Sequence, residues 1–128
     1  MTPPSSNRRR SSGHITLARA SRIHRLVRLL AESPRRRDDL LSDLQIGLRT
    51  FYRELELLQR RGLKVSRSLK EYRIKGTLAA AETRLPFPDP QLSFAEMAEL
   101  AKLPGATARR LAELLASVIS GPSPKKGR

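Results

Sequence analysis

Two arginines four residues apart, Arg49 and Arg53, offer the most specific chemistry in this sequence. A guanidinium group donates hydrogen bonds from a fixed plane, which suits phosphate oxygens and the edge of a guanine base. Residues four apart lie on one face of an α-helix, so both groups would project together. Thr50 and Tyr52 lie beside them, and hydroxyl groups of this kind contact phosphates. The spacing therefore indicates a helix face that contacts a polyanion.

The charge of the chain favours the same class of partner. Its 128 residues include 26 Lys and Arg against 12 Asp and Glu, a formal net charge of +14. The excess is largest in residues 1–37, which hold ten basic residues and one acidic residue. A cationic protein attracts nucleic acid through its long-range field and through the release of condensed counterions.

Two helices are predicted before the arginine pair. The first, Leu17–Glu32, ends before Pro34, because the residue that precedes a proline avoids the helical region. The second, Arg37–Leu44, has acidic residues in its first turn, where the helix dipole favours anions. The first helix has an apolar stripe at helical spacing, made of Ile23, Leu26, Val27 and Leu30.

A third helix is predicted over residues 48–61, and its two faces differ in character. Phe51, Leu55 and Leu58 recur at i, i+4 and i+7 and predict the buried face. Arg49 and Arg53 fall on the opposite, outward face. The helix is therefore expected to pack through its phenylalanine and to present its arginines to solvent or to a ligand.

A tight turn and a hairpin flank this third helix. Residues 45–47 leave room only for a turn, and residues 63–67 and 72–75 read as two short strands. The order helix, helix, turn, helix, hairpin predicts a mainly α fold of the α+β winged-helix type. It consists of a three-helix helix-turn-helix core with a two-stranded wing, followed by a C-terminal two-helix segment.

The chain is expected to contain one DNA-binding domain and one appended helical hairpin. The terminal segments are rich in Pro, Ser and basic residues and have few apolar side chains, so disorder is expected there. The predicted organisation is a basic arm at 1–14, a winged helix-turn-helix at 15–76, a proline-containing linker at 77–92, a helical hairpin at 93–120 and a tail at 121–128.

The hairpin at 93–120 needs a partner surface. Ser93 and Glu96 form a capping-box pattern at its start. An amphipathic pair of helices does not bury its apolar face alone. We expect either a homodimer through these residues or packing against the winged helix of the same chain. The apolar residues concerned are Phe94, Met97, Leu100, Leu111, Leu114, Leu115 and Val118.

The predicted function is sequence-specific binding of double-stranded DNA. The helix at 48–61 would enter the major groove and the hairpin at 63–75 would act as the wing. Non-specific binding to RNA or to the nucleoid, and a role as a protein–protein adaptor, remain as alternatives. The residues expected to contact DNA are Arg36, Arg37, Leu48, Arg49, Thr50, Tyr52, Arg53, Lys64, Arg67, Lys70 and Arg73.

These residues also bear a resemblance to a known family. The sequence RTFYRELELL from Arg49, followed by GLKV from Gly62 and YRI from Tyr72, resembles the DeoR-like (HTH type 11) winged helix-turn-helix of bacterial WYL-domain transcriptional regulators. The resemblance extends from Ser21 to Lys75. Glu54 stands where the family usually has aspartate.

The resemblance implies a transcriptional regulator in the bacterial cytoplasm, at the nucleoid. It also implies that Arg49, Thr50, Tyr52 and Arg53 face DNA. The family's second domain, which is expected to sense a ligand, does not fit within this chain. The chain also has no tryptophan. A small-molecule effector is therefore not expected.

Catalytic, metal-binding and membrane functions are not expected. The sequence has no cysteine, and its two histidines, His14 and His24, have no nucleophile or ligand set at a recognisable spacing. Asp38, Asp39 and Asp43 are explained by helix capping and solvation. No apolar run reaches the length of a membrane span. The sequence thus predicts no enzyme, no cofactor, no metal site and a cytoplasmic location.

Overall fold

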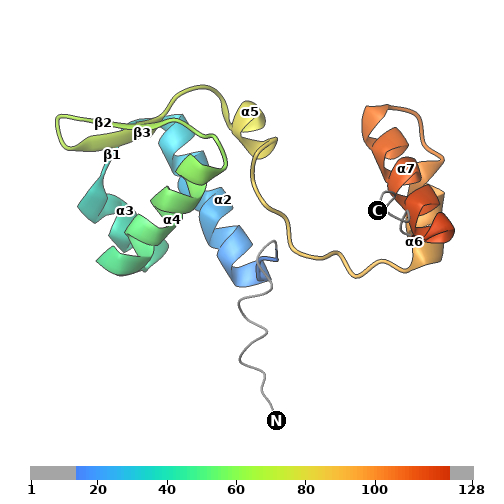
Figure 1. The fold of residues 1–128 in the computed structure, drawn as a ribbon. Helices are drawn as coiled ribbons and strands as arrows, with labels where there is room; N and C mark the ends of the chain where they lie inside the picture. Colours follow the sequence, from blue (N-terminus) through green and yellow to red (C-terminus); the bar gives the residue numbers. More distant parts are fainter. Residues whose placement is uncertain (1–13, 122–128) are drawn as a thin grey trace, which may run out of the picture. The chain divides into compact units, whose positions relative to one another are not determined.

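The structure of the protein, a computed structural model, describes residues 14–121 (Figure 1). The predictions for the basic arm and the C-terminal tail fall almost entirely outside these residues. The chain forms two compact units, one ending at Pro88 and one beginning at Asp89. The first has the winged-helix-like architecture that the sequence predicts, with helices α2, α3 and α4 and a small antiparallel sheet.

The helical core of the first unit follows the predicted pattern closely. Helix α2 spans Leu17–Glu32, α3 spans Arg37–Leu44 and α4 spans Leu48–Arg60, one residue shorter than predicted. The Thr16 hydroxyl caps α2 by accepting a hydrogen bond from the Arg19 backbone N–H at 3.1 Å. All four residues of the predicted stripe on α2 are buried, so this face is confirmed as core.

The turn between α3 and α4 sets the geometry of the helix-turn-helix. Gln45 closes α3 in the left-handed conformation, with φ at 57°. Ile46 N–H then donates to the Leu41 carbonyl at 3.1 Å, and Gly47 is the N-cap of α4. The chain therefore reverses within three residues and leads directly into the predicted recognition helix.

The sheet has three strands rather than the two predicted. Strands β2 (Val65–Ser68) and β3 (Glu71–Ile74) form the wing hairpin, joined by a two-residue turn. A two-residue strand, β1 (Arg35–Arg36), pairs with the other edge of β3 and gives the order β1-β3-β2. Strand β1 arises from tertiary pairing with β3, so the sequence pattern around it gave no sign of it.

The core lies between the three helices and one face of the sheet. Tyr72 and Ile74 point inward from β3. The Phe51 and Tyr72 rings meet edge to face, with centroids 5.3 Å apart. Phe51 thereby links α4 directly to the wing. The side chains with no exposed surface are Leu26, Val27, Leu40, Phe51 and Leu58.

A short helix that the sequence analysis did not predict follows the wing. Helix α5 spans Leu78–Glu82 and is capped by the Thr77 hydroxyl. Ala81 is buried with the core, and Glu82 Oε2 lies 2.7 Å from Nε2 of His24 on α2. The segment predicted as a linker over 77–92 therefore begins with a helix that packs on α2.

The second unit consists of α6 (Phe94–Ala101) and α7 (Ala106–Ser120), which pack on each other. The capping box is confirmed, because Ser93 and Glu96 exchange side-chain-to-backbone hydrogen bonds of 2.8 and 3.0 Å. Between Asp89 and Gly121, only Ala108 is buried. Large apolar side chains remain exposed, namely Leu92, Phe94, Leu100, Leu103, Leu114, Val118 and Ile119.

Candidate nucleic-acid interface

The outward face of α4 presents the predicted contact residues near the start of the helix. Arg49, Tyr52 and Arg53 are exposed, whereas Phe51 has no exposed surface. Leu48 is also exposed and Thr50 is half-buried. The predicted division of α4 into a buried face and an arginine-bearing face is therefore confirmed.

The arginine pair on α4 is free of competing carboxylates. In the part of the chain that the structure describes, no Asp or Glu oxygen lies within ion-pair distance of Arg49 or Arg53. The only acidic residue of α4 that pairs on its surface is Glu56, with Arg60 one turn later at 3.6 Å. Both guanidinium groups are thus available to an external acceptor.

Tyr52 links α4 to the start of α3. Its hydroxyl accepts a hydrogen bond from Nη1 of Arg37 at 3.1 Å. The contact lowers the pKa of the Tyr52 phenol, because the guanidinium stabilises the phenolate, and it raises the pKa of Arg37. Tyr72 lies close by on β3, and burial raises its pKa. The guanidinium of Arg67 lies 5.8 Å from the centre of the Tyr72 ring.

These shifts predict a two-step tyrosine titration. Tyr52 and Tyr72 are the only tyrosines and the chain has no tryptophan, so tyrosinate absorbance reports these two groups alone. One step is expected below the usual tyrosine pKa of about 10 and the other above it. The variant Arg37→Gln should move the lower step upward, because it removes the charge that stabilises the phenolate. A single unsplit step in the wild-type protein would contradict the Arg37–Tyr52 contact.

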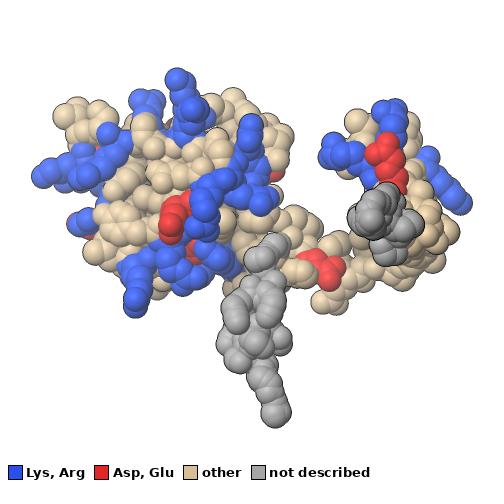
Figure 2. All heavy atoms as spheres, in the orientation of Figure 1, with Lys and Arg blue, Asp and Glu red and all other residues tan. Residues whose placement is uncertain are grey.

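Four predicted cationic residues surround one hollow of about 250 Å³. Arg36 and Arg37 come from β1 and the start of α3, and Arg67 and Lys70 come from the wing. Figure 2 shows Lys and Arg side chains around the outer end of the wing hairpin. The hollow is completed by Tyr72 and by one carboxylate, Asp38. This charge balance favours an anion.

Arg37 also has an unused hydrogen-bond donor at this hollow. Its Nε is buried and has no acceptor within the described residues, and Asp38 Oδ1 is 3.6 Å away. The nearby Asp38 carboxylate compensates this buried donor in part. A phosphate oxygen in the hollow would balance the surrounding cations and accept hydrogen bonds from their exposed donors.

The structure does not bring all the predicted wing residues together. Arg67 pairs with Tyr72 across the hairpin, whereas Arg73 pairs with Ser66, so the two arginines project from opposite faces of the sheet. Arg73 lines a different hollow. Lys64 precedes β2, is exposed and does not line the four-cation hollow.

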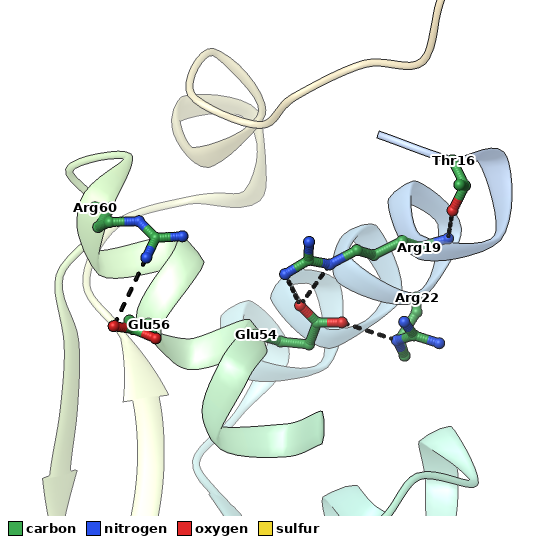
Figure 3. Close-up of polar contacts among 6 residues, drawn as sticks. All are labelled: Thr16, Arg19, Arg22, Glu54, Glu56 and Arg60. Atoms are coloured by element: carbon green, nitrogen blue, oxygen red, sulfur yellow. Dashed lines mark hydrogen bonds and ion pairs between the residues drawn. The ribbon is translucent and has the colours of Figure 1, made fainter. Parts of the chain in front are cut away.

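The most buried charge of this unit was missed from the sequence. The Glu54 side chain on α4 is 1% exposed and is held by two arginines of α2 (Figure 3). Arg19 donates to Oε1 from Nη2 at 2.7 Å and from Nε at 2.9 Å. Arg22 Nε donates to Oε2 at 3.0 Å. This network joins α4 to α2 on the side away from the arginine-bearing face.

A signal for the network was present in the sequence. Phe51, Glu54, Leu55 and Leu58 together complete the i, i+3, i+4, i+7 pattern of a buried stripe, with a carboxylate at one core position. Arg19 and Arg22 extend the stripe of α2 in the same way. Opposite charges at core positions of two helices indicate a buried ion pair.

Comparisons with protein-family models, with curated proteins and with solved structures found no match for this chain. Within residues 14–121, no three His, Asp or Glu side chains gather closely enough to hold a metal ion. None of the helices in this range is long and apolar enough to cross a bilayer. The candidate interface is the basic surface formed by α4 and the wing.

Proposed function

We propose that this protein binds double-stranded DNA sequence-specifically and regulates transcription. In this proposal α4 lies in the major groove and the β2–β3 hairpin contacts the duplex as a wing. The observation that carries the proposal is the four-cation hollow beside the exposed face of α4. A site suited to phosphate therefore lies next to a helix face suited to base edges.

The hollow would fix the protein on the duplex backbone. Arg36, Arg37, Arg67 and Lys70 come from segments separated in sequence, so folding is required to assemble them. Phosphate contacts position a protein and set its register without reading sequence. The hydrogen bond from Arg37 to Tyr52 couples this hollow to α4, because Tyr52 belongs to the outward face of that helix.

The free arginines of α4 would supply sequence recognition. Arg49 and Arg53 are one turn apart near the helix N-terminus, which is the part of a recognition helix that reaches base edges. Each can make a bidentate contact with O6 and N7 of guanine.

We further propose that the chain is a DeoR-like regulator of the HTH type 11 class that acts in the bacterial cytoplasm, at the nucleoid.

We also propose that α6 and α7 form a homodimer with a second copy. Only Ala108 is buried among the described residues of this unit, and seven large apolar side chains are exposed. A two-helix unit so poorly buried gains stability by pairing with another amphipathic hairpin. A dimer would place two copies of α4 on half-sites about one helical turn of DNA apart, or a multiple of it.

Selection from a pool of random duplexes tests both proposals. The full-length protein is expected to enrich a defined sequence, and a two-fold symmetric pair of half-sites would be the mark of the dimer. The selected duplex should outcompete a scrambled duplex at physiological salt, since specific binding exceeds non-specific binding by about 10³-fold or more. Equal competition would favour a non-specific nucleic-acid-binding protein, and no retained duplex would favour a protein–protein adaptor.

A further inference from the structure

Leu69, at the tip of the wing, is the most exposed large apolar side chain of the described residues, at 92%. It forms the two-residue turn of the hairpin together with Lys70, after the last strand pair, Ser68 and Glu71. Neither residue is glycine, yet both have positive φ, 54° for Leu69 and 67° for Lys70. The tip of the wing therefore combines an unfavourable backbone conformation with an unburied leucine.

The folded chain gains nothing from leucine at this position. A turn with positive φ at both central residues favours Asn-Gly or Asp-Gly, because a Cβ atom crowds the backbone in the left-handed region. Burial would compensate for this strain, but Leu69 has almost no contact with the rest of the protein. Backbone strain and exposed apolar surface that persist together are characteristic of functional positions.

The surroundings of Leu69 indicate the chemistry of its partner. The wing carries five cationic side chains between Lys64 and Lys75 and a single carboxylate, Glu71. Arg67 and Lys70, on either side of the leucine, line the proposed phosphate hollow. An apolar tip between two phosphate-binding cations fits the minor groove of a duplex, where an apolar side chain can enter between base pairs while cations contact the flanking backbone.

The position of the wing is consistent with such an insertion. The Phe51–Tyr72 ring contact holds the middle of the hairpin against α4. Leu69 lies two residues beyond Arg67, the cross-strand partner of Tyr72, so it projects past the ring contact at the outer end of the hairpin. The minor groove adjacent to the major groove that holds α4 is about 6 Å wide, which a leucine side chain can enter.

We propose that Leu69 is an apolar wedge that enters the minor groove and partly unstacks one base step, which bends the duplex. This inference rests on the proposed function, because it requires a duplex held by α4. It adds a recognition element, since base steps differ in how readily they unstack and kink. The protein would then prefer a flexible pyrimidine–purine step at the position of the wing.

The test compares the wild-type protein with Leu69→Asn on the duplex that the wild-type protein selects. Asparagine suits positive φ, so the fold and the thermal stability should be retained or improved. The wild-type protein is expected to bend the duplex, seen by energy transfer between end labels, and to raise the fluorescence of 2-aminopurine placed at the contacted step. Leu69→Asn should lose both signals, and Leu69→Met should keep them. A matched control, Leu17→Asn at the first position of α2, where the leucine is 74% exposed, should change neither signal.

The outcomes of this test distinguish failure of the wedge from failure of the proposed DNA binding. If the wild-type protein selects no duplex, the proposed function and the wedge both fail. If a duplex is selected but stays straight with unchanged 2-aminopurine fluorescence, the wedge alone is wrong. The wedge is also wrong if Leu69→Asn bends the duplex and raises the fluorescence as the wild-type protein does.

Discussion

Replacing Arg49 and Arg53 together by alanine is expected to weaken binding to the selected duplex by about two to four orders of magnitude. Each bidentate contact between arginine and guanine contributes about 1–3 kcal/mol of discrimination, and the double variant loses two of them. Binding to a scrambled duplex should fall far less, because the backbone contacts remain. The specificity ratio therefore collapses, which a competition titration at fixed salt measures directly.

The matched control removes the same two charges elsewhere. Arg109 and Arg110 are exposed on α7, and their replacement by alanine lowers the net charge equally. This control should reduce binding to both duplexes slightly and by similar factors, as expected for a long-range field. Thermal unfolding should be unchanged in the α4 variant, since both arginines are solvent-exposed. Unchanged discrimination in the α4 variant would mean that α4 is not the recognition helix.

The sequence predicted the helices well because each has a strong apolar period. The bounds of α2 and α3 agree with the prediction, and α4 differs by one residue. The burial of Phe51 and the exposure of Arg49 follow from the same period, since they occupy different faces of one helix. An apolar period that recurs along a single helix can be recognised from the sequence without knowing which other elements pack against that helix.

The missed features all depend on contacts between elements. Strand β1 is two residues long and exists through its pairing with β3. Helix α5 has five residues, too few for a period, and is stabilised by packing of Ala81. The four-cation hollow depends on how the wing lies beside α3. The opposite directions of Arg67 and Arg73 were predictable, however. Arg73 lies between the inward-facing Tyr72 and Ile74 and so faces away, whereas Arg67 is two residues from Val65 and shares its inward face.

The ion network around Glu54 leads to the second large effect. Replacing Arg19 and Arg22 together by alanine is expected to destabilise the winged-helix unit by about 3–5 kcal/mol, because it leaves an unpaired carboxylate in the interior. Glu54 is 1% exposed, whereas Arg19 and Arg22 are 28% and 30% exposed. The buried partner is therefore the one that cannot reach water when the network is broken. Urea unfolding followed by tyrosine fluorescence reports this unit alone, since both tyrosines lie within it.

The opposite replacement should have a much smaller effect. In Glu54→Leu the arginines can turn their guanidinium groups into water, and a leucine of similar size fills the interior, so stability should be nearly unchanged or higher. Adding the two alanines to Glu54→Leu should then destabilise the unit little further. A double-mutant cycle isolates this coupling. If the arginine replacements destabilise both backgrounds equally, their aliphatic packing rather than the buried carboxylate holds α4 on α2.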